Sequence, residues 1–95
     1  MTPFNGLTPA EAERLAMLIE ECGEVIQIAS KVLRHGYDSY HPNDPSTDNR
    51  ELLSRELTDL ISIHVLMMSR GDLREVPVVD VQPTIDRKMT FAHHQ

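Results

Sequence analysis

Two segments of this chain repeat apolar residues every three or four positions, and this spacing constrains the fold more than any other feature. The repeat starts at Leu15 in the first segment and at Leu53 in the second. Such spacing places side chains along one side of an α-helix. The residues are Leu15, Leu18, Cys22, Val25, Ala29 and Val32, widened by Ile19, Ile26 and Leu33, and then Leu53, Leu57, Leu60, Ile61, Met67 and Met68. We predict an all-α protein with its core along these rows.

Helix start and stop signals bound both segments. Thr8, followed by proline and by Glu11 three residues later, forms a capping box with Pro at the first helical position. Gly36 ends that segment, and Asp48 three residues before Glu51 is a second start signal, whose helix continues as far as Gly71. We therefore predict one helix over residues 9–35 and a second that continues as far as Gly71. Together they form the core region of the domain, residues 9–70.

The remaining segments lack helical periodicity. Residues 36–49 hold two prolines, a glycine and several Asp, Asn and Ser residues, which predicts a long loop. A loop of this length permits an antiparallel hairpin. For the C-terminal arm, residues 72–95, we predict an extended stretch over the β-branched VPVVDVQP and a short helix after Thr84. The whole chain, 1–95, is expected to be one domain.

Size and charge exclude several classes of partner. The 95 residues include 15 acidic and 9 basic ones, for a net charge of −6, so no basic surface is expected to attract a nucleic-acid polymer or an anionic membrane. The single cysteine, Cys22, cannot form an internal disulfide. The N-terminus lacks the pattern of a secretion signal, and no apolar run is long enough to span a bilayer. We expect a cytoplasmic protein, in the host cytoplasm if the chain is viral.

Acidic residues form a second row on each predicted helix, next to the apolar one. Glu21 and Glu24 share a row with Met17, Ile28 and Lys31, and Glu56 and Asp59 share one with Leu52, Ile63 and Leu66. In an antiparallel hairpin, Glu24 lies about 15 Å before the end of the first helix and Glu56 about 12 Å after the start of the second, at 1.5 Å per residue. The two acid pairs are therefore expected to come level.

Clustered glutamates usually belong to a solvated acidic surface, and that interpretation fits this chain poorly. Such surfaces pair Glu with Lys or Arg four residues later. Here the residues four beyond Glu20, Glu21, Glu24, Glu56 and Asp59 are Glu24, Val25, Ile28, Leu60 and Ile63. Converging carboxylates repel one another unless a cation lies among them, and carboxylate oxygens without nearby thiolates favour Mg²⁺ or Mn²⁺.

EECGE followed, after a proline-containing loop, by ELTD resembles the EExxE…ExxD signature of the MazG-like all-α nucleoside triphosphate pyrophosphohydrolases, particularly their short, phage-type members. The resemblance covers residues 11–68. It implies Mg²⁺-dependent cleavage of a (d)NTP into the monophosphate and pyrophosphate, in nucleotide-pool control. The resemblance implies that Glu21, Glu24, Glu56 and Asp59 are the metal ligands. It implies that Glu20 is a further ligand or the group that orients the attacking water. The catalytic residues would then be Glu20 and Glu21.

Basic and aromatic residues near the end of the first helix are candidates for substrate binding. Lys31 and Arg34 are candidates to hold the leaving pyrophosphate, or are ordinary charges at a helix C-terminus. His35, together with Tyr37 and His41, would contact phosphate or base, or lie on the surface. His64 falls on the apolar row of the second helix, and we interpret it as a packed, hydrogen-bonded core histidine.

Two features depart from the larger members of that family. An arm replaces their further helices, so a partner subunit must supply the missing half of a four-helix bundle. No tryptophan is present to stack on a base, and the preference for dGTP or another purine nucleotide rests only on a phage origin. We expect a dimer or a dimer of dimers. The alternative is a non-catalytic helical interaction module that dimerises and offers its acidic surface to a basic partner.

Overall fold

The fold consists of helices alone in the part of the chain that the computed structural model describes, residues 5–75 and 78–95. Helix α1 spans Pro9–His35 and α2 spans Asn49–Ser69, followed by the 3₁₀ helix η1, Val78–Asp80, and α3, Val81–Met89. The predicted all-α class is confirmed, and both long helices lie within two residues of their predicted bounds.

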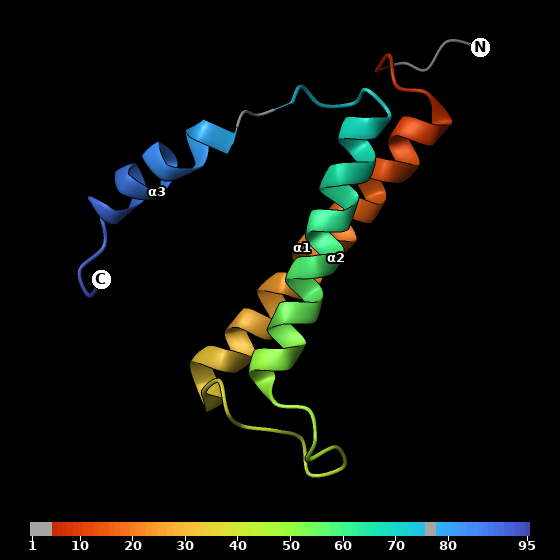
Figure 1. Ribbon diagram of the computed structural model, residues 1–95. Coiled ribbons are helices and arrows are strands. Elements are labelled where there is room, and N and C mark those ends of the chain that lie inside the picture. Colours follow the sequence, from red (N-terminus) through yellow and green to blue (C-terminus); the bar gives the residue numbers. More distant parts are fainter. Residues whose placement is uncertain (1–4, 76–77) are drawn as a thin grey trace.

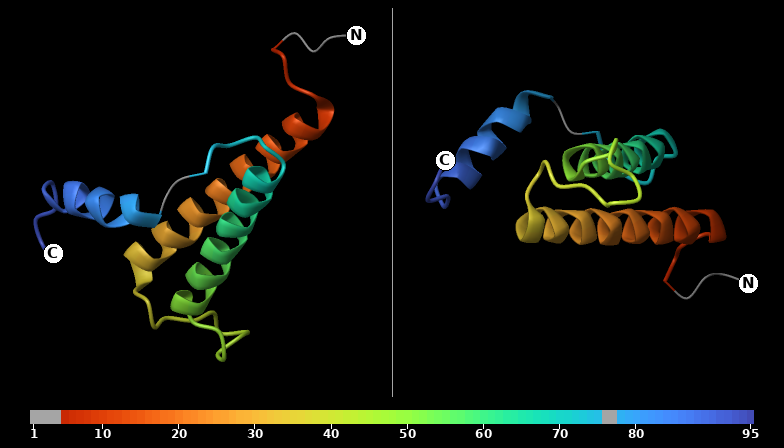
Figure 2. Two further views of the ribbon diagram at one scale, coloured as in Figure 1. Left: turned by 45° about the horizontal axis from the view of Figure 1, so that its top comes forward. Right: turned by 90° about the horizontal axis from the view of Figure 1, so that it is seen from below.

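Helices α1 and α2 run antiparallel and lie side by side along most of their length, joined by the loop at one end (Figures 1 and 2). The caps explain where each begins. The Thr8 hydroxyl accepts a hydrogen bond from the Glu11 N–H at 3.1 Å, while the Glu11 carboxylate accepts one from the Thr8 N–H at 2.9 Å. The Asp48 carboxylate accepts from the Glu51 N–H at 2.9 Å. Each cap satisfies N–H groups that have no partner inside their helix.

The prediction of the core was right in part: Met67 of the predicted row is buried and most of its other members are half-buried, but the contact between the helices is shifted toward the rows that carry the acids. The buried apolar residues of the hairpin are Ile28, Ile63 and Met67, and the first two belong to the rows that carry the acids. Several residues of the predicted core rows are exposed instead: Ile19, Cys22, Ile26, Leu33, Leu57 and Ile61. His64, predicted to be packed in the core, is also exposed. We call Ile19, Ile26 and Leu33 with Leu57 and Ile61 the exposed apolar rows.

The prediction for the C-terminal arm was wrong in part. Helix α3 begins at Val81 and not after Thr84, and η1 precedes it, so most of the stretch predicted to be extended is helical. Residues 76–77 of that stretch lie outside the described residues. Pro83 does not prevent the helix because it is the third residue of α3, where backbone N–H groups have no intrahelical acceptor.

Helix α3 continues directly from η1 and stands apart from the hairpin (Figures 1 and 2). The side chains of Val81, Ile85 and Met89 recur every fourth residue along it and are exposed. None of the helices in the described ranges is long and apolar enough to cross a membrane.

Candidate metal centre

Four carboxylates from the two long helices converge at one place between them. Glu21 and Glu24 come from α1, and Glu56 and Asp59 come from α2. One oxygen of each lies within 4.8 Å of the corresponding oxygens of the other three. We call these four residues the carboxylate cluster. They are the residues that sequence spacing predicted to come level, and their role as metal ligands remains a prediction.

The helix pair forces the cluster together because its members share rows with the buried core. Glu21 and Glu24 precede Ile28, and Glu56 and Asp59 precede Ile63, by seven and four residues in each case. Packing of the two isoleucines therefore turns the acids toward the opposite helix. Three members are half-buried, and Asp59 is exposed.

The electrostatics of the cluster are those of like charges held close. Burial, and then the neighbouring negative charge of Glu24, raises the pKa of Glu21 above its ordinary value. For Glu56, the neighbouring Glu24 carboxyl raises the pKa most, followed by burial. None of the ion pairs within residues 5–75 and 78–95 includes a member of the cluster.

Two oxygens of the cluster, Glu21 Oε2 and Glu56 Oε2, are buried and accept no hydrogen bond. A buried carboxylate oxygen without a donor is unfavourable unless a cation lies beside it. The ligand set is all oxygen and comes from both helices, as hard divalent cations such as Mg²⁺ and Mn²⁺ prefer. The residues present therefore fit a divalent cation.

A groove of about 320 Å³ opens beside the cluster, and Glu24 and Glu56 form part of its lining. Ile28 and Leu52 contribute apolar lining, and Lys31 and Arg34 bring two positive charges to the same groove. Lys31 is half-buried, whereas Arg34 is exposed. Lys31 and Arg34 therefore lie in the same small groove as two members of the carboxylate cluster. Positive side chains beside a candidate metal site would suit an anionic ligand with several phosphate groups.

Other residues singled out from the sequence lie outside this group. Glu20 is exposed and does not belong to the cluster, and His35, the last residue of α1, is exposed and does not line the groove. His41 and Tyr37 are exposed loop residues, and the Tyr37 ring centroid lies 4.5 Å from the Arg50 guanidinium carbon. The roles assigned to Glu20 and His35 remain predictions.

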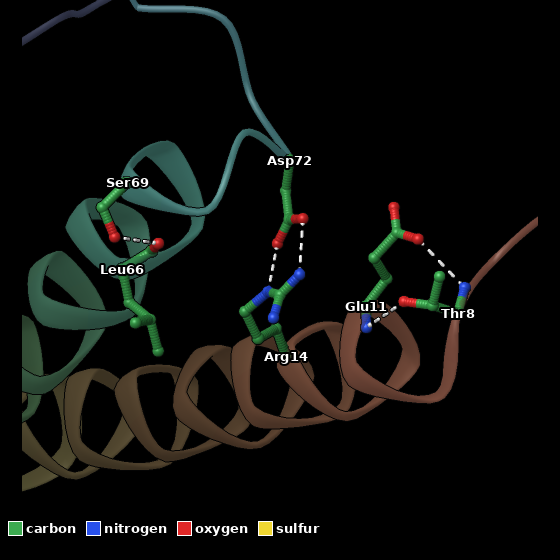
Figure 3. A network of polar contacts seen from close by, with 6 residues as sticks. All are labelled: Thr8, Glu11, Arg14, Leu66, Ser69 and Asp72. Atoms are coloured by element: carbon green, nitrogen blue, oxygen red, sulfur yellow. Dashed lines mark hydrogen bonds and ion pairs between the residues drawn. The ribbon is translucent and has the colours of Figure 1, made fainter.

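Two polar contacts that the sequence did not reveal lie on either side of the cluster. Arg14 near the start of α1 forms a bidentate ion pair with Asp72, just beyond α2, and the Nη2–Oδ1 distance is 2.8 Å (Figure 3). At the other end, Asn49 is fully buried and its Nδ2 donates to the Gly36 carbonyl at 3.0 Å. Its spacing from Leu52 and Glu56 is a signal that would have placed Asn49 on the acidic row of α2.

Comparisons of this chain with protein-family models, with curated proteins and with solved structures found no match.

Proposed function

We propose that this chain is a Mg²⁺-dependent nucleoside triphosphate pyrophosphohydrolase, which hydrolyses a (d)NTP to the (d)NMP and pyrophosphate. The observation that carries the proposal is the convergence of four carboxylates within 4.8 Å, with two buried oxygens that accept no hydrogen bond. The resemblance of EECGE and ELTD to the MazG-like signature supports the choice of reaction. In this proposal Glu21, Glu24, Glu56 and Asp59 hold the metal.

The residues of the groove suit the other requirements of the reaction. When bound, Mg²⁺ supplies a Lewis acid that neutralises phosphate charge and promotes attack of water on phosphorus. Lys31 and Arg34, which line the groove, would bind the β- and γ-phosphates and hold pyrophosphate as it leaves. Ile28 and Leu52 keep bulk water from part of the groove, which strengthens these charge interactions. Glu20 is the proposed group for orienting the attacking water.

The experiment that tests this function is pyrophosphate release from a panel of ribo- and deoxyribonucleoside triphosphates, with Mg²⁺, Mn²⁺, Ca²⁺ or EDTA. We expect release with Mg²⁺ and with Mn²⁺, poor activity with Ca²⁺, and a reversible loss in EDTA. The same panel identifies the preferred base and sugar, for which a purine deoxynucleotide such as dGTP is the first candidate. No release from any nucleotide would favour the alternative of a non-catalytic interaction module.

The proposal includes a homo-oligomer, a dimer or a dimer of dimers, that covers the exposed apolar rows. The chain exposes 7886 Å², whereas a compact monomer of this mass exposes about 5,500 Å². Part of the excess of about 2,300 Å² belongs to η1 and α3, which stand apart from the hairpin, and the exposed apolar rows supply the surface that an oligomer would cover. Light scattering at micromolar concentration is expected to give a dimeric or tetrameric mass, and Ile26→Lys with Ile61→Lys to reduce it. A monomeric mass with full helicity would refute the oligomer.

A further inference from the structure

Repulsion within the carboxylate cluster raises the question of what holds α1 and α2 in register without a cation. Among the described residues three apolar side chains are fully buried and others along both helices are half-buried. Apolar packing is non-directional, so it resists sliding of one helix along the other less than a directional contact does. A sliding motion would separate the acids and relieve their repulsion. Directional contacts between the two helices are therefore needed on the cluster's flanks.

Asn49 has the properties of such a contact. Its side chain is fully buried, and its Nδ2 donates to the carbonyl of Gly36, the residue that ends α1, at 3.0 Å. Its backbone N–H donates to the Ser39 carbonyl at 2.9 Å. One residue thus joins the end of α1, the loop and the start of α2.

Capping of α2 does not account for Asn49. Asp48 already caps this helix through the Glu51 N–H. The Asn49 Oδ1 atom is buried and accepts no hydrogen bond, which is unfavourable for an amide oxygen. The Asn49 side chain is therefore oriented so that its Nδ2 donates to Gly36, although this orientation leaves its Oδ1 without a hydrogen-bond donor.

Asn49 also lies on the row of α2 that carries the acids, at a spacing of seven residues from Glu56. This separation is two helical turns, about 10 Å along the helix axis. An α-helix transmits an axial displacement along its length with little loss, so the position of Asn49 relative to Gly36 determines the position of Glu56 relative to Glu24. The Arg14–Asp72 ion pair restrains the opposite end of the hairpin.

We propose that Asn49 is a positioning residue for the carboxylate cluster, the buried contact that fixes the axial register of α2 against α1. The consequence for metal binding and turnover rests on the proposed function, whereas the register does not. Arg50 provides a matched control because it is the next residue and also contacts the loop, but it does so from outside. Its guanidinium lies over Tyr37 and 3.3 Å from Asp38, and it is exposed.

The register is tested by a disulfide between positions 24 and 56, in a Cys22→Ser background that carries Glu24→Cys and Glu56→Cys. This background removes two of the four cluster carboxylates, so it measures the register that Asn49 imposes with much of the repulsion gone. The rate of disulfide formation under limiting oxidant reports how often the two positions meet, with no need for metal or nucleotide. We expect Asn49→Ala to slow this reaction by roughly fivefold or more, and Arg50→Ala to change it by less than about twofold. Asn49→Asp is a second variant that keeps the size of the side chain, places an acid in the first turn of α2 and loses the donor to Gly36. It is expected to slow the reaction as well.

The same substitutions, made in the chain without the cysteine changes, test whether Asn49 affects metal binding. Asn49→Ala is expected to raise the Kd for Mn²⁺, measured from the spectroscopic signal of free Mn²⁺, by roughly tenfold, whereas Arg50→Ala leaves it near the natural value. If the natural chain binds no Mn²⁺ or releases no pyrophosphate, the proposed function fails and the disulfide rates still decide the role of Asn49. Equal disulfide rates for the Asn49 variants and their parent, or equal slowing by Arg50→Ala, would overturn the inference. Loss of helicity in both Asn49 variants would also overturn the inference, because it would show that Asn49 is needed for the fold as a whole and not for the register alone.

Discussion

Two acidic sites of the hairpin, Asp72 and the carboxylate cluster, have opposite electrostatic surroundings. At the open end, Asp72 meets Arg14 in a bidentate ion pair, and the side chains are only 10% and 16% exposed. Hydrogen bonding to Arg14 lowers the pKa of Asp72. In the carboxylate cluster the acids meet one another, and the pKa of Glu21 and of Glu56 is raised.

This difference indicates that a missing counter-charge in the cluster is a specific feature and not a general property of an acidic chain. Lys31 and Arg34 line the groove beside the cluster, yet neither forms an ion pair with it. Like charges held in this way destabilise the folded protein unless a ligand offsets them. Pairing stabilises the fold at one place, and its absence at the other supports the proposed cation site.

The largest expected effect comes from removing a charge from the cluster. We expect Glu56→Gln or Glu24→Gln to reduce pyrophosphate release by roughly a hundredfold or more, because each removes a proposed metal ligand. The Tm in EDTA should stay the same or rise, because one repelling charge is gone. Glu13→Gln is the control, with the same chemical change at an exposed position of α1 outside the cluster. Loss of activity together with unfolding would instead assign Glu24 and Glu56 a structural role.

Removing a charge from the paired end should have the opposite effect. Asp72→Asn keeps the shape of the side chain but leaves the largely buried Arg14 guanidinium without its counter-charge, so we expect the Tm to fall by several degrees. Asp38→Asn is the control, because the Asp38–Arg50 pair is 3.3 Å long and exposed, and such pairs stabilise little. Turnover by Asp72→Asn at temperatures where it is folded should remain close to natural. Equal thermal shifts for the two variants would contradict this comparison.

A smaller effect is expected from pH in the absence of metal. The raised pKa of Glu21 and Glu56 means that the folded state binds protons more tightly than the unfolded state. The free energy of unfolding should therefore rise as the pH falls from 7 through the raised values toward 4.5, the ordinary value for glutamate. The lowered pKa of Asp72 acts in the other direction, and its contribution is lost only as the pH falls below 3.8 toward the lowered value.

Thermal melts in EDTA between pH 7 and 4.5 measure this effect, with Glu21→Gln as the comparison that isolates the cluster from the histidines. The variant should show a weaker rise toward acid pH than the natural chain. Identical pH profiles for the two proteins would show that Glu21 does not carry a raised pKa.

The caps and the acid spacing made part of the structure predictable from sequence. Thr8 and Asp48 signal helix starts through local chemistry, and the two acid pairs become level in any antiparallel hairpin with this loop. The sequence did not show how far the face between the helices extends toward the acidic rows, because Ile28 is as apolar as Ile26 and only packing distinguishes them. Contacts between distant residues, such as Arg14 with Asp72, leave no spacing signal at all.

The central claim, that the cluster binds a divalent cation, is tested most directly by thermal melts at fixed ionic strength, with millimolar Mg²⁺ or Mn²⁺ against EDTA. A cation that binds the folded cluster and hardly binds the unfolded chain must raise the Tm progressively with its concentration. We predict such a rise for the natural chain and for Glu13→Gln, and a much smaller one for Glu24→Gln and Glu56→Gln. No metal-dependent shift in the natural chain, or equal shifts in all four proteins, would contradict the metal site.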